Sequence, residues 1–72
     1  MTVSDSVQLQ FNGQPLSVPM QATLAELLES VGMRATLVAV ERNQEIVPRE
    51  QYATTRVADG DVIEAVTLVG GG

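Results

Sequence analysis

At 72 residues, with 44% hydrophobic and 18% charged residues, the chain has the size and composition of one small folded domain. It contains no cysteine, histidine or lysine, all four of its basic residues are arginines, and its formal net charge is −5. These absences exclude disulfides, thiolate and imidazole catalysis, lysine Schiff bases and the usual zinc ligands, and the acidic balance argues against nucleic-acid binding.

The chain begins with a predicted β-hairpin. Val7, Leu9 and Phe11 alternate with glutamines, which is the period of a half-buried strand. Asn12-Gly13 follows as a two-residue hairpin turn. A second strand then runs to Pro19, and the proline at position 15 favours an edge position because its nitrogen cannot donate a hydrogen bond.

A helix is predicted to begin after Thr23, because Thr23 and Glu26 have the spacing of a capping box. Its apolar residues recur at i, i+3, i+4 and i+7, which places them on one face: Leu24, Leu27, Leu28 and Val31. Gly32 lies where a left-handed residue commonly ends a helix.

A second hairpin is predicted after the helix. Residues 37–40 are all apolar, so we expect a strand that is buried on both faces. A turn over residues 42–44 leads into a short strand over residues 45–47. Residues 49–54 then form a turn or short 3₁₀ segment, with Tyr52 packed inward.

The last predicted strand, residues 62–69, is the longest, and its two largely apolar faces favour a central place in the sheet. Asp59-Gly60-Asp61 precedes it as a turn. Two carboxylates flanking a glycine provide far fewer than the six to eight oxygens of a calcium site, so we expect no metal there.

The order hairpin, helix, hairpin, turn, strand predicts an α+β fold of the β-grasp (ubiquitin-like) type. We expect a mixed sheet of four to five strands with one helix packed across one face. Residues 1–69 would form the domain, and residues 70–72 a flexible glycine tail.

The chain ends in Gly70, Gly71 and Gly72, directly after the last strand. Glycine loses the most conformational entropy on folding, so three in succession are not expected to serve stability. They form a thin arm that presents the α-carboxylate of Gly72. The alternative is a frayed end without function.

We expect a cytoplasmic protein with no membrane attachment. Residues 1–6 lack the basic and apolar regions of a signal peptide, and residues 37–40 are the longest apolar run.

Two internal blocks carry a family resemblance. The segment VERNQEIVPREQY, from Val40 to Tyr52, and the segment DGDVIE, from Asp59 to Glu64, together with the terminal Gly-Gly, resemble the ThiS-type sulfur carriers of thiamine biosynthesis. The resemblance covers nearly the whole chain, including its element order.

This resemblance implies that Gly72 is the reacting residue. A ThiF-type adenylyltransferase would use ATP to adenylate its carboxylate, and a sulfur donor such as a cysteine desulfurase would convert it to the thiocarboxylate of a 1-thioglycine. A ThiG-type thiazole synthase would then take the sulfur. The chain would be a carrier without bound cofactor and not an enzyme, with Gly70 and Gly71 entering the partner active sites.

Five residues are candidates for partner docking. If Ile63 faces the helix, Val66 and Leu68 lie on the open face of the sheet and form an interaction patch; the alternative is that they pack beside Leu9 or Val38. The charged candidates are Arg42, Arg49 and Glu50, for which the alternative is an ordinary solvated turn.

Two further functions stay open from the sequence. One is a sulfur carrier for another pathway, similar to the small subunit of molybdopterin synthase. The other is a β-grasp interaction module whose tail has no chemistry.

Overall fold

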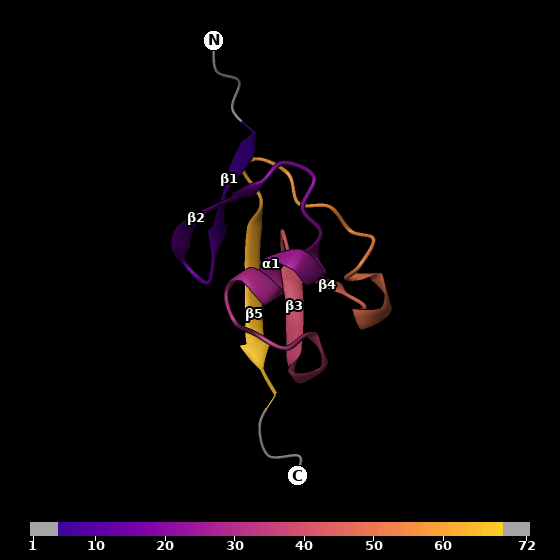
Figure 1. The fold of residues 1–72 in the computed structure, drawn as a ribbon. Coiled ribbons are helices and arrows are strands. Elements are labelled where there is room, and N and C mark those ends of the chain that lie inside the picture. Colours follow the sequence, from indigo (N-terminus) through magenta and orange to yellow (C-terminus); the bar gives the residue numbers. More distant parts are fainter. Residues whose placement is uncertain (1–4, 69–72) are drawn as a thin grey trace.

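The computed structural model describes residues 5–68, which form a five-stranded mixed sheet covered on one face by helix α1 (Figure 1). The strand order is β2-β1-β5-β3-β4; β5 runs parallel to β1 and antiparallel to β3. The elements are β1 (Ser6–Phe11), β2 (Gln14–Pro19), α1 (Leu24–Ser30), the 3₁₀ turn η1 (Ala35–Leu37), β3 (Val38–Arg42), β4 (Glu45–Val47), the 3₁₀ turn η2 (Arg49–Gln51) and β5 (Val62–Thr67). This architecture confirms the predicted β-grasp arrangement, with β2 on an edge and β5 in the centre.

Both hairpins turn through two residues with positive φ, as the Asn12-Gly13 sequence predicts for the first. The predicted turn over residues 42–44 was one residue too long, because Arg42 is the last residue of β3 and pairs with Glu45. In the first, φ is 52° at Asn12 and 80° at Gly13. In the second, φ is 53° at Asn43 and 72° at Gln44, so this turn forms without a glycine. Such turns match the right-handed twist of the strands that they join.

Helix α1 is capped at both ends by its own sequence. The Thr23 hydroxyl accepts from the Glu26 N–H at 3.1 Å, and a Glu26 carboxylate oxygen accepts from the Thr23 N–H at 2.9 Å. Gly32 has φ of 81°, which lets the Met33 N–H donate to the Leu28 carbonyl at 2.9 Å. The predicted capping box and glycine termination are confirmed.

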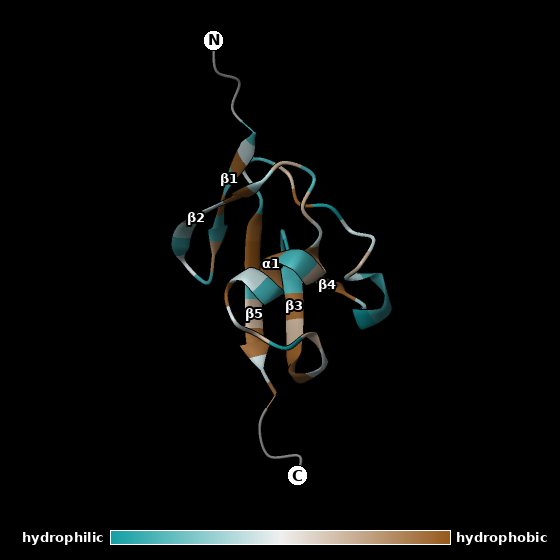
Figure 2. Ribbon diagram, in the orientation of Figure 1, coloured by the Kyte–Doolittle hydropathy of each residue, from teal (hydrophilic) through white to brown (hydrophobic). Residues whose placement is uncertain are grey.

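The core lies between α1 and one face of the sheet. Six of its side chains are less than 2% exposed: Leu24, Leu27, Leu28, Val38, Val40 and Ile63. Hydrophilic residues cover the outer face of α1 and the η2 segment (Figure 2). Tyr52 is buried as predicted, and its hydroxyl donates to the Val38 carbonyl at 3.3 Å.

The predicted third strand was wrong at its first residue and in its burial. Leu37 belongs to η1, where its N–H donates to the Arg34 carbonyl at 2.9 Å, and its side chain is 47% exposed. The strand begins at Val38, and Ala39 is only half-buried. The 3₁₀ turn η1 leads the chain from the helix layer into the sheet. The apolar run of residues 37–40 is therefore divided between η1 and β3.

The last strand also differs from its prediction. β5 has six residues, as many as β1 and β2, and only one of its faces is buried, since α1 covers a single side of the sheet. Val69, the predicted last residue of this strand, lies outside the described residues.

Candidate functional site

The candidate site lies at the carboxyl end of β5, the strand that leads to the terminal glycines. β5 is the third of five strands, held between β1 and β3 (Figure 1). After its last residue, the Leu68 N–H donates to the Leu37 carbonyl at 2.8 Å, so the chain stays paired beyond the strand. Gly70, Gly71 and Gly72, and with them the predicted boundary between domain and tail, lie outside the described residues.

Asn12 holds β5 from the side of the first hairpin. β1 ends where Phe11 pairs with Ile63, and the Asn12 N–H donates to the Ile63 carbonyl at 2.9 Å. The Asn12 side-chain amide then pairs with both backbone groups of Ala65, accepting from its N–H at 2.8 Å and donating to its carbonyl at 3.1 Å. The side chain therefore continues the β-ladder for one position beyond the end of β1.

Asn43 holds β5 from the side of the second hairpin. Its N–H donates to the Val62 carbonyl at 2.7 Å, and its side-chain oxygen accepts from the Val62 N–H at 2.9 Å. Sequence reasoning missed both clamps. The only available signal was the position of Asn12 and Asn43 at the start of tight turns, where asparagine tolerates positive φ.

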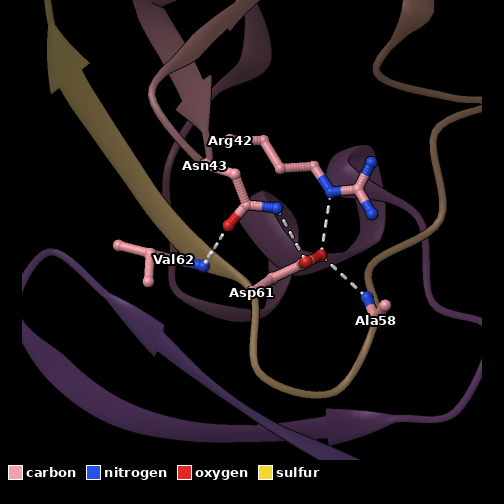
Figure 3. Close-up of polar contacts among 5 residues, drawn as sticks. All are labelled: Arg42, Asn43, Ala58, Asp61 and Val62. Carbon is pink, nitrogen blue, oxygen red and sulfur yellow. Dashed lines mark hydrogen bonds and ion pairs between the residues drawn. The ribbon is translucent and has the colours of Figure 1, made fainter.

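Asp61 ties the beginning of β5 to the second hairpin (Figure 3). Its side chain is buried and accepts from the Ala58 N–H at 2.8 Å, from Arg42 Nε at 2.8 Å and from Asn43 Nδ2 at 3.1 Å. Burial by itself raises the pKa of the Asp61 carboxyl, but these three hydrogen bonds and the Arg42 charge together hold that pKa below its ordinary value.

Arg42 therefore has a structural contact that the docking prediction did not include. Its side chain remains 31% exposed, and its Nε is held by Asp61. Arg49 and Glu50 are exposed on η2, after the edge strand β4, so β3 and β4 separate them from β5. The structure thus does not bring the three charged docking candidates to the carboxyl end of β5.

The apolar docking candidates do lie there, on the open face. Val66 is 62% exposed and Leu68 is 52% exposed, whereas Ile63 and Ala65 on the opposite face are buried. Leu9 and Val38, which the alternative reading placed beside Val66, belong to the buried core under α1. That alternative is therefore wrong.

The open face carries further apolar side chains. Along with Val66 and Leu68, the exposed ones on β5, β4 and η1 are Val62 at 46%, Ile46 at 67% and Leu37 at 47%. Large side chains exposed on adjoining elements are typical of a protein-interaction surface.

The acidic residues of the described part of the chain are not grouped as a metal site would require. Within residues 5–68, no three acidic side chains are grouped to hold a metal ion. The two aspartates of the predicted turn serve the fold, since Asp61 accepts the hydrogen bonds given above and Asp59 accepts from the Gln8 N–H at 2.8 Å. Over the same residues, no helix is long and apolar enough to span a membrane.

Comparison with known proteins places this geometry in a family. Residues 8–72 match the model of the ThiS family. The chain is 41% identical over 66 residues to the sulfur carrier protein ThiS of Escherichia coli, covering 92% of this chain and all of that one. The crystal structure of the thiamine biosynthesis protein ThiS from Geobacter metallireducens superposes with a TM-score of 0.78 at 36% identity, covering 92% of this chain and 100% of that one.

The chain also matches part of a longer protein. It is 42% identical over 66 residues to a thiazole synthase of Paramagnetospirillum magneticum, and this match covers 92% of the chain. The chain spans only 20% of the length of that relative. A segment of this kind is therefore one part of a protein that carries the thiazole synthase name.

Proposed function

This chain belongs to the ThiS family, and from that premise we propose that it carries sulfur as a thiocarboxylate on Gly72 for formation of the thiazole of thiamine. The observation that carries the proposal is the extent of the family match, which runs through the domain to Gly72. Gly70 and Gly71 would form the narrow segment that enters the active sites of partner enzymes, because glycine has no Cβ to clash with a channel wall.

The chemistry begins with activation of a poor electrophile. A carboxylate repels nucleophiles and has no good leaving group, so an adenylyltransferase of the ThiF type joins the Gly72 carboxylate to the α-phosphate of ATP and releases pyrophosphate. The terminal sulfur of a persulfide, supplied by a donor such as a cysteine desulfurase, then attacks the carbonyl carbon and AMP leaves. A second thiol cleaves the resulting S–S bond, which releases the thiocarboxylate and a disulfide.

The next partner in this proposal is a thiazole synthase of the ThiG type, which accepts the sulfur. The relative named thiazole synthase supports this pairing, because a segment similar to this chain is part of the same polypeptide there. The absence of cysteine, histidine and lysine from the sequence fits a carrier whose partners supply the catalytic groups. ATP acts at the activating enzyme, and the cytoplasm is the proposed location of these steps.

The experiment is intact-mass analysis of the chain after incubation with its adenylyltransferase, ATP and a sulfur donor. We expect a mass increase equal to the exchange of one oxygen for one sulfur, and no increase in a variant that lacks Gly72. Failure to form either the adenylate or the thiocarboxylate with active partners would contradict the proposal. Thiamine auxotrophy of a deletion strain, with molybdoenzyme activity retained, distinguishes this pathway from the molybdopterin alternative.

A further inference from the structure

Two glutamates face each other in the middle of the open sheet face. Glu41 on β3 and Glu64 on β5 are directly paired in the antiparallel register. The hydrogen bonds from Asn43 to Val62 and from Leu68 to Leu37 mark alternate pairs along this ladder, which places Glu41 and Glu64 in a hydrogen-bonded pair. Buried residues alternate with half-buried ones along β3 and with exposed ones along β5, which puts both glutamate side chains on the face away from α1.

This placement opposes the stability of the isolated chain. Like charges directly opposite each other on adjacent strands destabilise a sheet. Within residues 5–68 the ion pair is that of Arg42 with Asp61, and neither Glu41 nor Glu64 has an arginine partner. Solubility does not explain the pairing, because the same charges would serve solubility at separated positions.

Exposed apolar side chains lie on several sides of the two carboxylates. Val62 and Val66 lie two residues to either side of Glu64 on the same face of β5, and Ile46 is paired with Glu41 on the adjacent strand. A partner that covers these apolar side chains removes water from around both carboxylates. Electrostatic attraction to a cation then becomes stronger, because the local dielectric constant falls.

We propose that the open face docks a protein surface that inserts an arginine side chain between Glu41 and Glu64, with apolar contacts around it. Arginine fits this pair better than lysine, because its planar guanidinium has five N–H donors and can bind two carboxylates at once. The proposal rests on the proposed function for the identity of that surface, which is the adenylyltransferase that acts on the tail. Leu68 is a further exposed apolar residue after the end of β5, so a partner that covers this face also holds the end of the strand against the enzyme.

The test uses the full chain and its adenylyltransferase in isothermal titration calorimetry at low and high salt. Glu41→Gln and Glu64→Gln should each raise the Kd about tenfold, and the double variant should raise it further and flatten its salt dependence. Glu29→Gln on the outer face of α1 removes the same charge from the other side of the molecule and serves as the matched control. It should bind as the wild type does.

Thermal denaturation provides the readout that separates docking from a structural role. Relief of the repulsion should raise the Tm of the double variant, by about 2–4 °C, while its binding weakens. Unchanged affinity, an equal loss in Glu29→Gln, or a lowered Tm that accounts for the loss would overturn the docking proposal. Self-association of the double variant with unchanged partner affinity would also overturn it.

Failure of the proposed function is distinguishable from failure of this inference. A wild-type chain that the adenylyltransferase neither binds nor adenylates would contradict both. A wild-type chain that is bound and adenylated, with variants that bind equally well, would contradict the docking surface alone.

Discussion

At the scale of single residues, Asp61 concentrates the polar contacts that fix the start of β5. One carboxylate, 6% exposed, accepts hydrogen bonds from the backbone N–H of Ala58 and from two adjacent side chains of the second hairpin, those of Arg42 and Asn43. A buried carboxylate with several donors is stabilised in its ionised form, and removing it leaves those donors unpaired.

This arrangement predicts a pH-dependent contribution to stability. Because the pKa of Asp61 is lower in the folded chain than its ordinary value of 3.8, the ionised carboxylate stabilises the fold above pH 3.8. That contribution is lost as the pH falls through the folded-state pKa. Asp61→Asn should reduce the free energy of unfolding by about 1–3 kcal/mol near neutral pH.

The measurement is urea unfolding at a series of pH values. The stability difference between wild type and Asp61→Asn should shrink as the pH is lowered below 3.8, because protonation removes the same charge from the wild type. Glu29→Gln, an exposed charge on α1, controls for the general effect of a lost charge. A difference that is constant with pH would show that the effect comes from shape and not from ionisation.

At the scale of elements, the edge strand β2 has two prolines at positions whose backbone faces away from the sheet. The Met20 N–H donates to the Asp5 carbonyl at 2.7 Å, and the register pairs Val18 with Val7, so the even-numbered residues of β2 bond inward to β1. The backbone groups of Pro15 and Pro19 therefore face away from the sheet. Two positions at which an exposed N–H could pair with another strand lack that N–H.

We expect the double variant P15T/P19T to self-associate more than the wild type. Threonine favours strand structure and restores an outward N–H at both positions, which opens the edge to pairing with a second chain. Size-exclusion chromatography over a range of concentrations measures the change. Ser17→Thr, which leaves both prolines in place, is the control, and equal elution of all three proteins would show that the prolines do not protect this edge.

At the scale of the whole molecule, the fold places the strand that leads to the tail at the centre of the sheet. β5 is paired on both sides, and the side chains of Asn12 and Asn43 add a clamp from each hairpin. On the open face near its end lie Val66 and Leu68. A partner that docks on this face therefore meets the end of β5, up to Leu68, in a defined position.

Under the proposed function, Gly71→Val should leave the fold intact and block adenylation. A β-branched side chain is stiff and wide at its Cβ, so it should obstruct a channel shaped for glycine. Far-UV circular dichroism and Tm should match the wild type, while intact-mass analysis should show little adenylate. Gly71→Ala should give an intermediate rate, and adenylation of Gly71→Val at the wild-type rate would contradict the channel argument.

Local sequence patterns were sufficient to predict the elements that depend on neighbouring residues. Asn12-Gly13 specified one turn, Thr23 with Glu26 specified the helix start, and Gly32 specified its end. Each of these signals acts through hydrogen bonds or φ values within a few residues. They can therefore be recognised in the sequence without knowledge of the tertiary structure. The alternating apolar pattern of β1 likewise predicted which of its faces is buried.

Contacts that depend on strand register became known from the folded chain and not from local patterns. The pairing of Glu41 with Glu64, the clamp of Asn12 on Ala65 and the contact of Arg42 with Asp61 each join residues at least 19 positions apart. A shift of one residue in register would move every β5 side chain to the other face, and local patterns do not specify that register. Within residues 5–68, helix α1 covers one face of the sheet (Figure 1). The apolar residues on that face of β5 therefore form part of the core, and those on the other face are exposed.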